Sequence, residues 1–236
     1  MSGTTTLRVF SALAVRAPFD ALERDFLKQY SHCELTLEWN PTSVIEKKIA
    51  AGATADAAIL TVPVIERLIE EGVIIADSRV DLVDSRIGLA TLPDAVAPDI
   101  SSLPALKQTL LTARSVAWSL GGASGIYFQT LIQRLGIEAE ITSRGTTIPE
   151  GFTARQLLTG KADLALQQIS ELLMVPGVKV IGPLPDEAQK VTAFAGGIFR
   201  TAANRQDAAA LLASLRTPQA RTTFESFGLR CRDQAV

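Results

Sequence analysis

The chain has 236 residues, of which 47% are hydrophobic, and a formal net charge of −2 at pH 7. This length and apolar content can fill the core of one large domain or of two small lobes. The small net charge and the absence of a Lys/Arg-rich run argue against nucleic acid or an acidic membrane surface as a partner. No stretch of about 18 apolar residues is present, so no membrane-spanning helix is expected.

Cysteine and histidine usage limits the metal and redox chemistry. The sequence has one histidine, and its two cysteines, Cys33 and Cys231, are far apart. We therefore expect no metal site and no other cofactor, and a disulfide only if the chain is exported. The first ten residues, MSGTTTLRVF, lack the basic start and long apolar core of a secretory signal. The protein is expected to be cytoplasmic as sequenced, or periplasmic if a leader was removed.

Strands and helices alternate three times at the start of the chain. The patterns predict strands at 7–10, 34–38 and 57–60, each followed by a helix, the helices ending near residues 30, 51 and 71. Gly52 and Gly72 follow two of these helices, and Pro63 falls in the first turn of the third. Such alternation is typical of a parallel sheet with helices on both faces.

The rest of the chain continues in the same style. Strands are expected at 86–92, 115–120, 163–167, 178–181 and 191–200. Helices are expected at 103–112, 124–135 and 152–158, after residue 171, and at 206–215 and 218–227. No repeat and no linker long enough to separate domains is present.

The segment 115–136 is the most informative single stretch. An apolar run ends at Gly121-Gly122, and a periodic segment begins at Ser124 and stops at Gly136. A strand, a glycine turn and a helix N-terminus leave free backbone N–H groups and the positive end of the helix dipole, which suit a small anion. The alternative is a tight connection with no ligand.

Four junctions share this chemistry, because each joins a strand to small or hydroxyl-bearing residues at a helix start. They are Ser11-Ala12, Thr42-Ser43, Ala123-Ser124-Gly125 and Gln168-Ile169-Ser170. Ligands of open α/β sheets lie at the carboxyl ends of the strands, where these junctions fall. Ser and Thr are also good helix caps, worth about 1 kcal/mol each. Four such junctions in two halves of the chain favour a binding site.

Other polar residues have weaker claims. His32 follows the first helix, at the edge opposite the expected ligand. Glu171 is the carboxylate nearest the fourth junction, although an exposed glutamate at a helix start is also favoured by the dipole. Tyr127 lies one turn into the central helix, where core packing is its default role. Arg86 and Arg200 lie on extended segments between the expected lobes, where they can pair with a ligand carboxylate or form salt bridges across the hinge.

The order of these motifs resembles that of the type II periplasmic solute-binding proteins, within them the molybdate-binding branch, which also contains aconitate-isomerase-like members. The matching segments cover most of the chain: LRVFSALAV, NPTSVIEKKIAAGATADAAIL, SLGGASGIYFQTLIQRLGI, QLLTGKADLALQQIS and AANRQDAAALLASLRTPQARTTFESFGL. The resemblance implies a two-lobed α/β fold with a mostly parallel sheet in each lobe. We expect residues 1–84 and 191–236 in lobe 1 and 85–190 in lobe 2, with the ligand between them. A hinge is expected at 85–88 and 194–197, where Gly196-Gly197 gives backbone freedom.

Carried over to this sequence, the oxyanion contacts of that family fall on Ser11, on Ser43 or Thr42, on Ala123 or Ser124, and on backbone groups near Gln168. The sequence departs from the family at Gln167-Gln168, where molybdate-binding members tend to carry an aliphatic residue and a tyrosine. Two side-chain amides suit a larger, flatter carboxylate or amide ligand.

Two functions follow. The first is a module that binds a small anion, either a molybdate-type oxyanion or a di- or tricarboxylate, and passes it to a transporter if the chain is exported. The second is a cofactor-free isomerase of a small polycarboxylate, with Glu171 or Tyr127 as the proton shuttle. A ligand-sensing domain of a regulator is disfavoured because the sequence has no helix-turn-helix or other partner domain.

Overall fold

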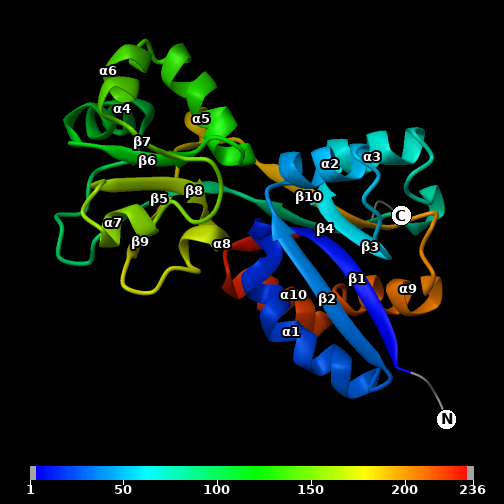
Figure 1. Cartoon of the computed structure of the whole chain (residues 1–236). Coiled ribbons are helices and arrows are strands. Elements are labelled where there is room, and N and C mark those ends of the chain that lie inside the picture. Colours follow the sequence, from blue (N-terminus) through cyan, green and yellow to red (C-terminus); the bar gives the residue numbers. More distant parts are fainter. Residues whose placement is uncertain (1–3, 233–236) are drawn as a thin grey trace. The chain divides into compact units, whose positions relative to one another are not determined.

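Two β-sheets organise the computed structural model, which describes residues 4–232 (Figure 1). Residues 4–84 and 192–232 surround a six-stranded sheet and form unit 1. Ser85–Val191 surround a five-stranded sheet and form unit 2. The chain passes between the units at residues 84–85 and 191–192.

The sheet of unit 1 has the order β11-β4-β10-β3-β1-β2. Its strands are β1 (Thr5–Ala12), β2 (Cys33–Asn40), β3 (Ala57–Thr61), β4 (Val80–Ser85), β10 (Thr192–Ile198) and β11 (Leu229–Cys231). Its helices are α1 (Arg16–Gln29), α2 (Thr42–Ala50), α3 (Val62–Glu70), α9 (Arg205–Ser214) and α10 (Pro218–Ser226), with 3-10 turns at Leu13–Val15 and Ala76–Ser78. β1 is parallel to β2 and β3, and β10 is antiparallel to β3.

Alternation along β1 divides the core of unit 1 between the two faces of the sheet. Leu7 and Val9 are buried in the cluster that includes side chains of α1, α9 and α10, and Phe10 is buried in the cluster that includes side chains of α2 and α3. Phe19 of α1 belongs to the first of these clusters. Period-two patterning of this kind is what a strand covered on both faces requires.

The sheet of unit 2 has the order β7-β6-β8-β5-β9. Its strands are β5 (Ile87–Thr91), β6 (Val116–Ser119), β7 (Thr146–Ile148), β8 (Leu164–Gln168) and β9 (Lys179–Pro183). Its helices are α4 (Leu103–Thr112), α5 (Ala123–Arg134), α6 (Glu138–Arg144), α7 (Arg155–Leu158) and α8 (Ile169–Leu172), with a 3-10 turn at Asp186–Ala188. β6 is parallel to β7 and β8, whereas β5 is antiparallel to β8 and β9.

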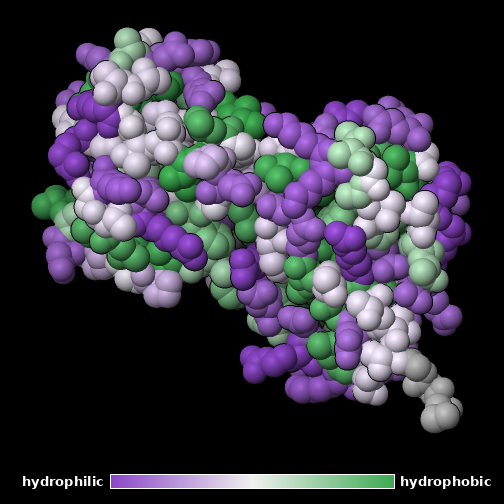
Figure 2. Space-filling model, viewed as in Figure 1, coloured by the Kyte–Doolittle hydropathy of each residue, from purple (hydrophilic) through white to green (hydrophobic). Residues whose placement is uncertain are grey.

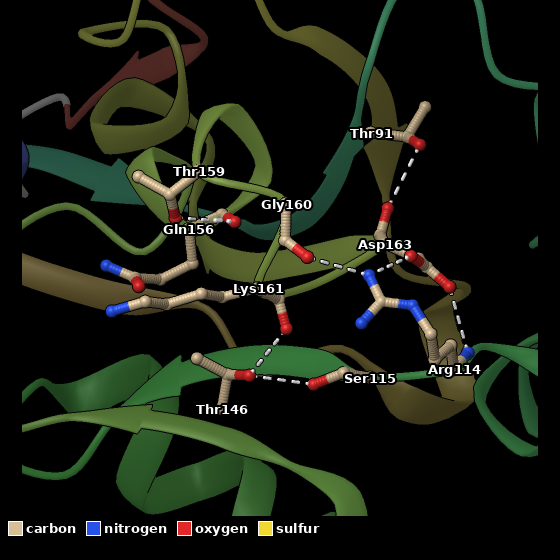
Figure 3. Close-up of polar contacts among 9 residues, drawn as sticks. All are labelled: Thr91, Arg114, Ser115, Thr146, Gln156, Thr159, Gly160, Lys161 and Asp163. Carbon is tan, nitrogen blue, oxygen red and sulfur yellow. Dashed lines mark hydrogen bonds and ion pairs between the residues drawn. The ribbon is translucent and has the colours of Figure 1, made fainter.

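A polar network fixes the starts of the strands in unit 2 (Figure 3). The Arg114 guanidinium lies 2.8 Å from an Asp163 carboxylate oxygen, and Thr91 Oγ1 donates to the Asp163 carbonyl at 3.1 Å. The hydroxyl groups of Ser115 and Thr146 are 2.8 Å apart. These contacts join the segments at the starts of β6, β7 and β8 to one another and to the end of β5.

The α/β class is confirmed, but both sheets are mixed rather than mostly parallel. The sequence patterns did not reveal β4, β7, β11 or α6. β7 and β11 have only three residues each, which is too short to show the alternation of a strand. α6 buries only Ile141, so its sequence shows no helical repeat of apolar residues.

The expected hinge glycines have a different role in the structure. Gly196 and Gly197 lie inside β10 and pair with Ile59 and Ala58 of β3. A Cβ atom added to Gly196 lies 2.6 Å from a methyl carbon of Leu212, and one added to Gly197 lies 2.6 Å from a side-chain carbon of Ile74. Close packing therefore requires glycine here, and the prediction that this pair supplies backbone freedom is corrected.

No helix between residues 4 and 232 is long and apolar enough to cross a bilayer. Hydrophilic residues are spread over the visible face of each unit (Figure 2). Cys33 and Cys231 are not joined by a disulfide.

Candidate functional site

The first turn of α5 packs directly on the end of β6 because of two glycines. A Cβ atom added to Gly125 lies 1.7 Å from the carbonyl oxygen of Ser119, and one added to Gly122 lies 2.5 Å from the Ser119 hydroxyl oxygen. Gly122 precedes the helix without a side-chain cap, and the Ile126 N–H donates to the Gly122 carbonyl at 3.0 Å. The N–H groups ahead of that bond form a helix N-terminus suited to an anion.

Buried hydroxyl groups gather on the segments at the ends of β6 and β8. Ser119, Ser124 and Ser170 are each no more than 2% exposed. Within residues 4–232 the hydroxyl oxygens of Ser119 and Ser170 have no hydrogen-bond partner. An unsatisfied buried hydroxyl costs about 1–3 kcal/mol, so such groups commonly serve a ligand or an ordered water. Ser119 was missed in the sequence because it closes an apolar strand and opens no helix.

Glu171, just after the end of β8, is an ionisable residue with an unusual environment. It is buried, which corrects the expectation of an exposed glutamate at a helix start. Burial raises the pKa of Glu171 from its ordinary value of 4.5 to about 8, although hydrogen bonds from the Gln168 backbone and the Gln167 side chain favour the charged form. The side chain is therefore mostly a neutral acid at pH 7 and can exchange a proton near physiological pH.

Gln167 holds Glu171 and the neighbouring loop rather than presenting a free amide. Its Oε1 accepts from the N–H of Thr153 at 2.8 Å and from the Thr153 hydroxyl at 3.0 Å. Its Nε2 donates to the Gly151 carbonyl at 2.8 Å, and the side chain also hydrogen-bonds Glu171. These contacts fill the capacity of the amide, so a ligand can reach it only by replacing one of them.

Gln168 is the last residue of β8. Its Oε1 accepts from the hydroxyl of Ser85 at 2.8 Å, and both side chains are buried. The parallel register pairs Ala117 with Ala165. β6 ends at Ser119 and β8 ends at Gln168, so Ser119, Gln167 and Glu171 belong to the same end of these two parallel strands.

Tyr127 has a structural partner. Its hydroxyl donates to the carbonyl of Ala188 at 3.0 Å, and the ammonium group of Lys190 lies 5.6 Å from the centre of its ring. These contacts favour the packing role over proton transfer.

Large apolar side chains beside the buried serines are exposed: Leu120, Ile126 and Leu173 are 44–49% accessible.

In unit 1, hydroxyl-bearing residues likewise lie near the carboxyl ends of β1, β2 and β3. Ser11 is fully buried inside β1 rather than at a helix start, and its hydroxyl is 3.4 Å from the Ala12 carbonyl. Thr42 begins α2, and its hydroxyl accepts from the Thr61 N–H at 3.4 Å. Ser43 follows in the first turn of α2 and is partly exposed. The first two predicted junctions thus share one edge of this sheet.

The remaining candidates have partners within their own units. Arg86 pairs with Asp186 at 2.8 Å, and Arg200 Nε donates to the Gly72 carbonyl at 2.8 Å. These contacts replace the expected salt bridges across a hinge. His32 lies in the turn just before β2, at the opposite end of the strands from Ser11, and the Thr5 N–H donates to its carbonyl.

Comparisons with known proteins agree with this architecture. The chain matches the family described as bacterial extracellular solute-binding proteins over residues 7–230. An aconitate isomerase from Pseudomonas sp is 35% identical over 187 residues, which cover 79% of this chain and 71% of that protein. The periplasmic molybdate-binding protein of Azotobacter vinelandii has a TM-score of 0.80 at 17% identity, covering 96% of this chain and 100% of that one. The sulfate-binding protein of Mycobacterium tuberculosis has a TM-score of 0.68 at 14% identity, covering 98% and 88%.

The two α/β units have the type II solute-binding fold, which the molybdate-binding structures share, and the resemblance of the sequence to solute-binding proteins is confirmed. The chain belongs to the bacterial extracellular solute-binding protein family.

Proposed function

We propose that the chain binds a small di- or tricarboxylate through the strand-end hydroxyl groups and the N-terminus of α5. The observation that supports this most is the pair of buried hydroxyl oxygens, on Ser119 and Ser170, that lack a partner within residues 4–232. Exposed Leu120, Ile126 and Leu173 lie on the same segments and suit a ligand with a carbon skeleton better than a bare oxyanion. Ser11, Ala12, Thr42 and Ser43, at the strand ends of unit 1, are proposed as the anion contacts of that unit.

We propose further that the bound polycarboxylate is isomerised, with Glu171 moving the proton. Two observations favour catalysis over plain binding: the buried carboxyl group with a pKa of about 8, and the similarity to an aconitate isomerase. As carboxylate, Glu171 takes a proton from the carbon next to the double bond; the C–H electron pair forms the new double bond. The electron pair of the old double bond moves to the carbon at its far end, where it takes the proton back from protonated Glu171 and forms the new C–H bond. Electrons balance, and no cofactor or redox partner is needed.

Without catalysis, the same site supports a binding protein that delivers its ligand to a transporter. The family includes proteins of that kind, and this function needs no role for Glu171 beyond orientation. The two functions share the ligand and differ only in whether the ligand leaves unchanged.

Thermal unfolding with a panel of ligands tests the binding part. Aconitate or another tricarboxylate should raise the melting temperature more than molybdate, tungstate or sulfate at equal concentration. A ligand present at one hundred times its dissociation constant adds about 2.7 kcal/mol to stability, which such a scan detects. A large shift with molybdate and none with any carboxylate defeats the proposal.

Serine variants locate the binding. Ser119→Ala, Ser124→Ala and Ser170→Ala should each weaken carboxylate binding up to about tenfold, because each removes one hydrogen bond of about 1–1.5 kcal/mol. Ser43→Ala checks the contribution of unit 1. Ser143→Ala is the control, since this exposed serine lies on α6 and donates to the Glu140 carbonyl. Equal affinity in the control and in all four site variants, measured by calorimetry, places the ligand elsewhere.

A further inference from the structure

Three different ligand-type side chains meet in unit 1, away from the strand-end hydroxyl groups. His32 is the turn residue directly before β2, Cys33 is the first residue of that strand, and Asp207 lies in the first turn of α9. His32 Nε2 is 3.2 Å from Asp207 Oδ1, and the imidazole nitrogen, the sulfur and the carboxylate oxygen all lie within 4.8 Å of one another. Cys33 is buried, whereas the side chain of His32 is 44% exposed.

We propose that His32, Cys33 and Asp207 form a binding site for a borderline divalent transition metal, with Zn²⁺ as the expected ion. Imidazole nitrogen, thiolate and carboxylate are the three ligand types that Zn²⁺ uses in proteins. With ordinary bond lengths of about 2.0–2.3 Å, tetrahedral ligand atoms stand roughly 3.3–3.6 Å apart, so the cluster needs to contract by about an ångström at most. Exposure on the His32 side leaves room for a water molecule as the fourth ligand.

The charges of the three groups fit a dication. Without a metal, His32 Nε2 lies within hydrogen-bond distance of Asp207 Oδ1. A bound Zn²⁺ takes the place of the thiol proton, and thiolate plus carboxylate then neutralise its charge.

The position of the cluster suggests what the metal does. Cys33 pairs with Thr5 at the start of β1, and Ser11 lies six residues further along the same strand, about 20 Å away at ordinary strand rise. The metal is therefore remote from the proposed ligand contacts of unit 1. It joins residue 33 to residue 207, one from each of the two chain segments that make up unit 1, and acts as a clip between them.

The single histidine had indicated that no such site exists. That expectation rested on the number of histidines and the spacing of the cysteines along the chain. It could not include Asp207, which is 175 residues from His32. Only the packing of α9 beside the start of β2 brings the third ligand into place.

Cobalt spectroscopy on the full chain, freed of any affinity tag and of metal, tests the site. One equivalent of Co²⁺ should produce a thiolate-to-cobalt charge-transfer band together with the strong visible absorption of tetrahedral cobalt. Zn²⁺ should then remove both signals by displacement. Cys231→Ser is the matched control and should keep the full signal, whereas Cys33→Ser should lose the charge-transfer band.

Asp207→Asn gives a second test that leaves the buried sulfur in place, in case Cys33→Ser does not fold. It should weaken metal binding at least tenfold, and the melting temperature gained by adding Zn²⁺ to the parent should largely disappear. Absence of the band in the parent overturns the proposal. So does an unchanged band in Cys33→Ser, or its loss in Cys231→Ser.

Discussion

Glu171→Gln should make the protein more stable at alkaline pH and leave its stability near pH 5 almost unchanged. The folded protein keeps the Glu171 proton up to about pH 8, whereas an ordinary glutamate releases it near 4.5. The folded state therefore binds more protons between these values, and the free energy of unfolding falls as the pH rises through this window. A pKa difference of this size corresponds to a loss of up to about 5 kcal/mol, which the uncharged glutamine avoids.

Denaturant unfolding at pH 5, 7 and 9 measures this effect. The difference between Glu171→Gln and the parent should grow steadily with pH. Glu150→Gln, at an exposed glutamate of the same unit, is the control and should show no such trend. A variant that is equally destabilised at all three pH values indicates that Glu171 is charged and needed for structure, which contradicts a neutral, buried acid.

Gly125→Ala should be strongly destabilising, although alanine normally favours a helix. The new Cβ atom lies 1.7 Å from the backbone carbonyl oxygen of Ser119, and neither backbone can move without separating α5 from β6. Overpacking of this kind costs about 1–3 kcal/mol or more. Carboxylate binding should fall as well, because the first turn of α5 shifts away from the strand end.

Gly122→Ala is the matched comparison for this effect. Its Cβ atom meets the Ser119 hydroxyl oxygen at 2.5 Å, and that hydroxyl group can rotate. Gly122 has a φ of −82°, which alanine adopts easily. Unfolding should therefore show a clearly smaller loss than for Gly125→Ala. Equal losses contradict the proposed packing of α5 on β6.

The repeated strand and helix patterns predicted most of the fold. The helix α4 was expected at 103–112 and spans Leu103–Thr112 in the structure, where the Ser102 hydroxyl accepts from the Ala105 N–H at 3.3 Å. The mixed character of the sheets could not be predicted, because pairing direction depends on contacts between distant strands. β5 and β8, for example, pair antiparallel although their sequences carry only the apolar run of a buried strand.

The candidate site could be located from the sequence but not characterised. Gly121-Gly122 and Ser124 indicated the junction, because glycine and serine at a helix start carry a local signal. The burial of Glu171 carried no such signal, since a glutamate at a helix start is usually exposed. The unpaired hydroxyl of Ser119 and the saturated amide of Gln167 depend on neighbours from other strands and loops, and emerge only in three dimensions.

The proposed isomerisation has the most direct test in proton NMR. A tricarboxylate with one double bond is incubated in D₂O at pH 8 with the parent, with Glu171→Gln and with Glu150→Gln. The parent and Glu150→Gln should convert it to the isomer, with deuterium at the exchanged carbon if the Glu171 proton equilibrates with solvent. The parent's rate should rise between pH 7 and 8 as Glu171 loses its proton. Glu171→Gln should bind the ligand and leave its spectrum unchanged. Equal conversion by Glu171→Gln, or no conversion by a parent that binds the ligand, contradicts catalysis by Glu171.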